Sequence, residues 1–194
     1  MDTQLTRQRV RRILDTLEMA SPQHKLEGEQ WYEVARRFAR SIHHNELSGA
    51  GVLAALSPRV TWSENQAGAR VICNAALSGE DMPLEGVAGL QANHIKAWHI
   101  ANGDWKFSPL EYLNKSKGNF KVNNFFRNIT GMSDYVTVDK WSAEVAEGFE
   151  VLGSVVGKQY LGIERAYQEA SFECPYTPRD LQAITWCVKR GNCI

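Results

Sequence analysis

Residues 117–122, with the sequence KGNFKV, predict a glycine-containing turn that enters a helix over 120–129. Such a turn exposes unpaired backbone N–H groups at the start of the helix, and these groups bind phosphate with the help of the helix dipole. Residues 105–128 hold five basic side chains and one acidic side chain, a net charge of +4. Because basic runs are common on protein surfaces, an ordinary solvated loop is the alternative interpretation.

A second stretch, VTVDKW at residues 136–141, places Asp139 after a short β-branched run and before an expected helix. An aspartate in this position is usually an N-cap, which stabilises a helix by roughly 1 kcal/mol. The same geometry holds a carboxylate at a fixed position at the helix end, where it could also take part in catalysis.

A third stretch, LSPRVTWSEN at residues 56–65, interrupts two apolar helices with polar residues and a proline. A proline disfavours helical geometry at the residue before it, so we expect a kink here. Arg59, Trp62 and Asn65 could read a nucleic-acid base by hydrogen bonding and stacking. A plain connection with a structural tryptophan is the alternative.

The rest of the chain is mostly helical in pattern, with apolar residues recurring at helical spacing. Breaks are expected over 21–28 and 48–51, and Ser63 is the expected N-cap of the fourth helix. The sequence therefore predicts an all-α fold. The expected helices cover residues 4–19, 29–42, 52–56, 62 or 63 to 76, 91–101, 110–113, 120–129, 140–147, 160–170 and 177–190.

Composition excludes several classes of protein. The 194 residues include 22 basic and 22 acidic side chains, and 43% of them are hydrophobic, enough for a real core. A mean hydropathy of -0.38 and the lack of a long apolar run argue against a membrane span, and the N-terminus lacks a signal peptide. Zero net charge argues against a protein that coats nucleic acid, but not against an enzyme with a local basic patch.

The four cysteines contain no CxxC pair, so neither a zinc site nor an iron–sulfur site is expected. We expect them to be ordinary thiols in a reducing cytoplasm. His43 and His44 are adjacent rather than one helical turn apart, so they do not form a helical metal pair. No metal or cofactor is predicted.

Six segments, taken in order, carry a family resemblance: GVLAALS at 51–57, the helix over 65–76, the helix over 90–101, the hairpin-like segment 115–126, VTVD at 136–139 and the last helix from 177. Together they resemble the helix–hairpin–helix DNA glycosylase superfamily, which includes endonuclease III and 8-oxoguanine glycosylase. The resemblance covers roughly residues 50–190. The iron–sulfur cysteines of endonuclease III-like members are missing. This leaves the cluster-free branch, closer to the 8-oxoguanine type or to a divergent bacterial or phage group.

The resemblance implies a single helical domain over 1–194, with two interleaved lobes around a cleft and the hairpin near 112–130. It implies that Asp139 is the catalytic aspartate and that Lys121 is the lysine nucleophile of bifunctional members. Double-stranded DNA with one flipped nucleotide is the implied partner of a monomeric enzyme. Phosphate contacts then fall to Lys115, Lys117, Gly118, Asn119 and Arg127, and base or strand contacts to Arg59, Trp62 and Asn65.

The expected activity is excision of a damaged or modified base, with AP-lyase activity through a lysine Schiff base. Two alternatives stay open, because a fold does not fix a function. One is an enzyme that modifies a base on the same scaffold without excising it. The other is a non-catalytic helix–hairpin–helix DNA-binding module. The expected location is the cytoplasm of a bacterial or phage-infected cell.

Overall fold

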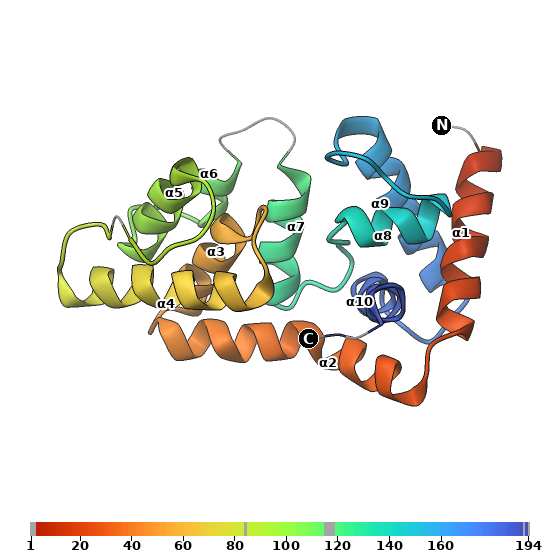
Figure 1. The fold of residues 1–194 in the computed structure, drawn as a ribbon, viewed down its shortest axis with the longest axis horizontal. Helices are drawn as coiled ribbons and strands as arrows, with labels where there is room; N and C mark the ends of the chain where they lie inside the picture. Colours follow the sequence, from red (N-terminus) through yellow and green to blue (C-terminus); the bar gives the residue numbers. More distant parts are fainter. Residues whose placement is uncertain (1–2, 84, 115–118, 192, 194) are drawn as a thin grey trace. The chain divides into compact units, whose positions relative to one another are not determined.

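A computed structural model of the chain describes residues 3–83, 85–114, 119–191 and 193. Over these residues the secondary structure is helical, without strands, which confirms the all-α expectation (Figure 1). The helices are α1 (Thr3–Glu18), α2 (Pro22–Ile42), α3 (Glu46–Leu56), α4 (Trp62–Ser78), α5 (Gln91–Ala101), α6 (Leu110–Leu113), α7 (Phe120–Ile129), α8 (Lys140–Glu147), α9 (Gly157–Ser171) and α10 (Pro178–Arg190).

The helices fold into two compact units. One unit combines Met1–Glu33 with Gly131–Ile194, and the other is Val34–Thr130. The chain passes from the first unit to the second within α2 and returns after α7. We call them the terminal unit and the central unit.

In the central unit, α3 packs against α4, α5 and α7 (Figure 1). Its residues from Ser48 to Leu56 are buried, and they are small or apolar on every side of the helix. A helix without a polar face is expected in the middle of a core. α3 is therefore the central element around which this unit is built.

The expected turn over 48–51 is wrong, because α3 begins at Glu46. Asn45 is the N-cap, and its side chain accepts hydrogen bonds from the backbone N–H groups of the first turn. The two glycines allow close packing instead of a turn. A Cβ on Gly49 would lie 2.3 Å from the carbonyl oxygen of Ala39, and one on Gly51 would lie 2.8 Å from Ile100.

The expected break over 21–28 is also wrong, because α2 begins at Pro22. Proline suits the first position of a helix, where its missing N–H is not needed. The Ser21 hydroxyl accepts a hydrogen bond from the N–H of His24 at 3.1 Å and so caps the first turn. Gly28 is a packing residue, since a Cβ there would lie 2.6 Å from the backbone of Ile184.

The N-cap of α4 is Thr61 rather than the expected Ser63. The Thr61 hydroxyl accepts from the N–H of Glu64 at 3.3 Å, and the Glu64 carboxylate accepts from the N–H of Thr61 at 2.7 Å. This reciprocal capping box satisfies two N–H groups at once, whereas a serine cap alone satisfies one.

In the terminal unit, α10 contacts α1, α8 and α9 (Figure 1). A buried ion pair joins α1 to α8, with Arg9 donating to the Glu147 carboxylate through Nη2 at 2.6 Å and Nε at 3.2 Å. Two hydrogen bonds to one carboxylate fix both the distance and the orientation of the pair.

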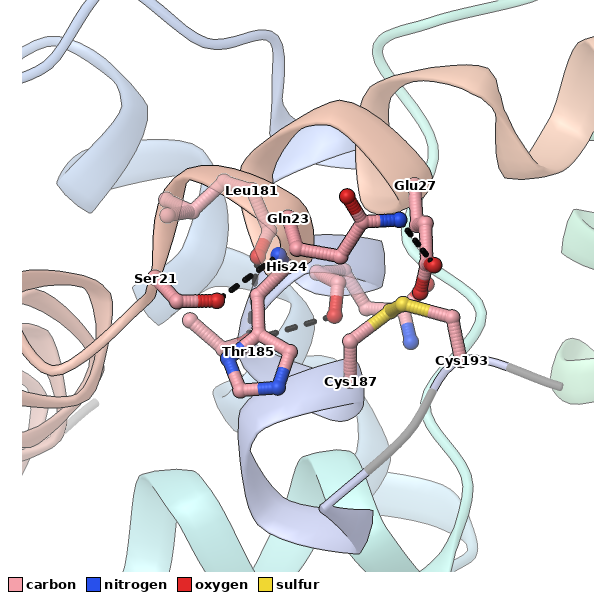
Figure 2. The surroundings of a disulfide bond; sticks show 9 residues. Ser21, Gln23, His24, Glu27, Leu181, Thr185, Cys187 and Cys193 are labelled. Carbon is pink, nitrogen blue, oxygen red and sulfur yellow. Dashed lines mark hydrogen bonds between the residues drawn. A yellow bond between two sulfur atoms is a disulfide. The ribbon is translucent and has the colours of Figure 1, made fainter.

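The expectation that all four cysteines are ordinary thiols is wrong for two of them. Cys187, near the end of α10, forms a disulfide with Cys193. The bond lies beside the first turns of α2, where Gln23 donates to Glu27 (Figure 2). Gly191, in a left-handed conformation, ends α10, and Cys193 follows two positions later. The spacing of the cysteines alone does not show this turn, so the sequence pattern did not predict the bond. Cys73 and Cys174 are free thiols.

Candidate functional site

Asp139 is the N-cap of α8, and both of its carboxylate oxygens accept hydrogen bonds. Oδ1 accepts from the N–H and the hydroxyl of Ser142, each at 2.9 Å. Oδ2 accepts from the indole N–H of Trp186 on α10, also at 2.9 Å. Three donors from two helices therefore fix the orientation of a half-buried carboxylate.

The short run before Asp139 is held in place by a tyrosine. The hydroxyl of the fully buried Tyr160 donates to the Val136 carbonyl at 2.7 Å and accepts from the Val138 N–H at 3.2 Å. The Val138 N–H also lies 3.1 Å from the Val136 carbonyl, so the run makes a tight turn and does not form the β-strand that its β-branched residues favour. One hydroxyl thus contacts two buried backbone groups of this turn.

Behind the carboxylate lies a chain of buried polar groups. The Gln182 amide donates to the Ser142 hydroxyl at 2.9 Å, and the Tyr32 hydroxyl donates to the Gln182 carbonyl oxygen at 2.9 Å. The exposed fractions of Ser142, Gln182 and Tyr32 are 0%, 4% and 3%. Half-buried Asp139 is therefore the accessible end of this chain.

Trp186 is enclosed by an aromatic ring and a cation. The guanidinium of Arg190 lies 4.4 Å from the centroid of its ring, and Trp31 meets it edge to face at 6.0 Å. A guanidinium over an indole face is attracted by the ring's electrons. This packing holds the indole ring that donates to Asp139.

Lys140, next to Asp139, forms ion pairs with two glutamates. Its ammonium lies 3.3 Å from the Glu150 carboxylate and 3.6 Å from that of Glu144. The hydrogen bond to Glu150 and the charge of Glu144 raise the pKa of Lys140 above its ordinary value. Two carboxylates therefore favour the charged form of the Lys140 ammonium.

Lys121 lies in the first turn of α7 in the central unit and is half-buried. The N-cap of α7 is Asn119, whose side chain makes no hydrogen bond to the N–H groups of the first turn. Its amide donates instead to the Leu113 carbonyl at the end of α6, at 3.0 Å. The first turn of α7 therefore has no side-chain cap of the kind that Asp139 gives to α8.

Two side-chain amide contacts join the end of α6 to the start of α7. The Asn123 amide donates to the Asn114 side chain, in addition to the bond from Asn119 to Leu113. Within α6, the Glu111 carboxylate accepts from two N–H groups that precede the helix. These are the N–H of Phe107 at 2.6 Å and the N–H of Ser108 at 3.2 Å. The bonds from the N–H groups of Phe107 and Lys106 lower the pKa of Glu111. The predicted site residues Lys115, Lys117 and Gly118 lie outside the described residues.

Arg127 lies near the other end of α7. Eight residues separate it from Asn119, which is about 12 Å along a helix. Its guanidinium donates to the Asn124 side chain at 3.4 Å, one helical turn away. The structure therefore does not bring Arg127 to the end of α7 that holds Asn119 and Lys121.

Arg59 lies in the connection between α3 and α4, and Trp62 is the first residue of α4. Arg59 is exposed and has a φ of 66°, a left-handed conformation that costs free energy for any residue but glycine. Trp62 begins α4 and packs edge to face on Phe38 at 6.1 Å, and the guanidinium of Arg70 covers the same Phe38 ring. An exposed guanidinium thus lies three residues from a half-buried indole.

Asn65 has a different environment. Its exposed fraction is 4%, and its amide donates to the Leu53 carbonyl in α3 at 3.0 Å. This bond joins α4 to α3 inside the core of the central unit. The arrangement gives Asn65 a packing role and does not bring it to the surface beside Arg59.

Sequence reasoning missed Ser142 and Trp186 as partners of Asp139, and Gln182 as the partner of Ser142. Ser142 could have been found, since the residue three positions after an N-cap supplies the N–H that the cap accepts. Trp186 lies 47 positions away from Asp139, and no local spacing links the two. Within the described residues, no group of three or more His, Cys, Asp or Glu side chains could hold a metal ion, and no helix is long and apolar enough to cross a membrane.

The chain belongs to the family of unknown function DUF7178, which matches residues 1–193. No curated protein and no solved structure matches the chain.

Proposed function

We propose that this protein is a DNA glycosylase that excises a damaged or modified base, with AP-lyase activity through Lys121. The single observation that carries the proposal is the state of Asp139, whose carboxylate is held by three donors at the N-cap of α8. This carboxylate follows the Val-Thr-Val-Asp run that resembles the segment before the catalytic aspartate of helix–hairpin–helix glycosylases. The start of α7, a first helical turn without a side-chain cap, supports DNA binding, because the positive end of a helix dipole attracts phosphate.

The proposed chemistry begins with a nucleotide that leaves the base stack, which costs a few kcal/mol. The bond between C1′ and the base nitrogen then breaks, and its electron pair leaves with the base. Positive charge develops on the sugar, and the Asp139 carboxylate stabilises that charge. The fixed orientation of the carboxylate suits this role, because a preorganised charge needs no rearrangement as the reaction proceeds.

Lys121 acts as the proposed nucleophile. Its neutral amine attacks C1′ of the sugar cation, and a nitrogen–carbon bond forms. The C1′–O4′ bond then breaks, its electron pair goes to O4′, and O4′ takes up the proton that the amine loses. The ring-opened Schiff base permits strand cleavage by β-elimination. Asn119 and the backbone N–H groups at the start of α7 would hold a neighbouring phosphate. Arg59 and Trp62 remain proposed strand or base contacts, from a guanidinium and a π-face. The proposed location is the cytoplasm, although disulfides such as Cys187–Cys193 are rare in cytosolic proteins.

Base release from a panel of duplexes tests the proposal. Each duplex carries one altered base, such as uracil, 8-oxoguanine, an oxidised pyrimidine or an alkylated purine, and the free base is measured by mass spectrometry. Wild-type protein is expected to release one of these bases, and Asp139→Asn to lose at least a hundredfold in rate while it still binds DNA.

Other results would favour the alternatives. DNA binding without base release, for every duplex of the panel, supports a non-catalytic binding module. A base of new mass in treated DNA, with no abasic site, supports a base-modifying enzyme. Base release by Asp139→Asn at the wild-type rate contradicts the proposed role of Asp139.

A further inference from the structure

The chain of buried polar groups behind Asp139 has a single direction of hydrogen bonding. The Tyr32 hydroxyl donates to the carbonyl oxygen of Gln182, which fixes how the Gln182 amide is turned. The Gln182 NH₂ group then donates to the Ser142 hydroxyl, so the only proton of that hydroxyl is available for Asp139 Oδ1. Each group thus directs the next, and the series ends on the carboxylate.

This arrangement exceeds what a helix cap requires. An N-cap is complete when one carboxylate oxygen accepts from the backbone of the first turn, and the Ser142 N–H already supplies that bond. The Trp186 indole and the Ser142 hydroxyl add two donors, and Gln182 and Tyr32 bring further polar groups into the core. Buried polar groups stabilise a fold only when all are satisfied, so a capping role alone does not account for them.

The helices that supply the donors are far apart in sequence. Asp139 and Ser142 belong to α8, Gln182 and Trp186 lie one turn apart on α10, and Tyr32 comes from α2. With the carboxylate bonded on both oxygens from two helices, rotation about its side-chain bonds would break at least one of these bonds. Asp139 is therefore confined to one orientation.

We propose that Trp186, Ser142 and Gln182 are positioning residues that hold the Asp139 carboxylate in the orientation its reaction needs. This inference rests on the proposed function. Trp186 donates to Oδ2, and Gln182 directs the Ser142 proton to Oδ1. None of the three residues needs to touch DNA. Their loss should lower the rate of the chemical step and leave DNA affinity unchanged.

Trp186→Phe is the first variant to test, because it removes the indole N–H and keeps an aromatic ring. Trp98→Phe is the matched control, since Trp98 is also half-buried but lies on α5 of the central unit. Single-turnover base release is measured with enzyme in excess, on the duplex that the wild-type protein cleaves in the panel. We expect Trp186→Phe to release base at least tenfold more slowly with an unchanged Kd for the duplex, and Trp98→Phe to match the wild type.

Ser142→Ala provides a second variant that is mild in volume. It keeps the backbone N–H that caps α8 and removes the hydroxyl that donates to Oδ1 and accepts from Gln182. We expect a loss of rate with an unchanged Kd here as well, and a larger loss when Ser142→Ala and Trp186→Phe are combined.

The indole N–H signals in a ¹H–¹⁵N spectrum report the contact without any substrate. Trp186→Phe identifies the Trp186 signal among the six tryptophans, and Trp98→Phe identifies the control signal. In Asp139→Ala the Trp186 signal should shift upfield as its hydrogen bond is lost, while the Trp98 signal stays in place. An unmoved Trp186 signal would overturn the inference whatever the activity.

The kinetic outcomes separate the two proposals. If Asp139→Asn loses base release and Trp186→Phe keeps the wild-type rate, the positioning inference is overturned and the proposed function stands. If Asp139→Asn keeps base release, or the wild-type protein releases no base, the proposed function fails and the positioning inference fails with it.

Discussion

A buried ion pair and a buried histidine give tests of the structure that do not depend on function. Arg9 and Glu147 form an ion pair in the terminal unit, and each has an exposed fraction below 10%. His43 lies in the central unit with its ring between backbone groups, where Nε2 contacts the Ala101 carbonyl at 3.0 Å and Nδ1 accepts from the Asn45 N–H at 2.9 Å. Each is a charged or titratable group inside a core, so its environment controls stability.

Glu147→Ala should destabilise the protein by about 3 kcal/mol, because it leaves the Arg9 guanidinium buried without its partner charge. Urea unfolding followed by circular dichroism measures the loss. Glu169→Ala is the control, since it breaks the exposed pair with Arg165 and should cost less than about 1 kcal/mol. Equal losses in the two variants would contradict the buried pair.

Stability should fall as the pH drops from 7.5 to 5.5, and His43 should account for part of the fall. Burial lowers the pKa of His43 below its ordinary value, and the charge of His44 adds to this. The unfolded chain therefore binds a proton near pH 6.5 that the folded chain does not, and stability is lost as pH falls through that value. Unfolding at several pH values measures the slope.

His43→Gln should flatten this slope, because glutamine does not titrate. The carboxyl groups with lowered pKa, such as Glu46 and Glu111, act at lower pH and do not enter the window. A slope that is the same in His43→Gln as in the wild type would contradict the assignment.

At the scale of elements, glycines determine how closely the helices pack. Gly49→Ala should destabilise the protein by about 3 kcal/mol, because the new Cβ would lie 2.3 Å from a backbone carbonyl oxygen that cannot move alone. This clash outweighs the gain of about 1 kcal/mol in helix propensity. Gly68→Ala on α4 is the control, since its Cβ would meet a movable Val87 methyl at 3.1 Å. Thermal unfolding of the two variants gives the comparison.

The same glycines explain where sequence reasoning about the elements succeeded and failed. The helices over 91–101, 110–113, 120–129 and 140–147 were predicted at their observed bounds, because turn residues and clear apolar spacing mark their ends. The starts of α2 and α3 were missed because Gly28 and Gly49 look like breaks in a sequence. Only the neighbouring chain, which approaches to backbone contact, shows that these glycines serve packing.

The candidate site shows the same limit. Asp139 was predictable as an N-cap, since its signal lies within three residues of it. Its partner Trp186 lies 47 positions later, and Gln182 lies 40 positions after its own partner Ser142. Asn65 proved to be a core residue because α3 lies against α4. Contacts between distant segments decide these roles, and local spacing does not encode them.

At the scale of the whole molecule, the disulfide makes stability depend on redox conditions. Cys193→Ala should destabilise the protein by about 2 kcal/mol, because Cys187 and Cys193 are six positions apart and close a short loop. Thermal unfolding with and without a reductant measures the effect. The reductant should lower the Tm of the wild type and leave that of Cys193→Ala unchanged. A Cys193→Ala variant as stable as the oxidised wild type would contradict the bond.

The net charge of zero hides an uneven distribution of charge along the chain. The 22 basic and 22 acidic residues cancel, but residues 105–128 carry a net charge of +4 around the connection from α6 to α7. A local basic segment suits an enzyme that contacts a few phosphates, and binding by such an enzyme should weaken with salt only modestly. A protein that coats DNA would depend on salt more steeply.

Borohydride trapping on a duplex with one abasic site tests the central claim most directly, because it does not depend on which base is excised. The reagent reduces a Schiff base to a stable bond, so an active lysine leaves a covalent protein–DNA adduct. We expect an adduct with the wild-type protein and with Lys106→Ala, a control lysine in the same basic segment, and none with Lys121→Ala. An adduct that persists in Lys121→Ala, or its absence with the wild type, would contradict the role of Lys121 as the nucleophile.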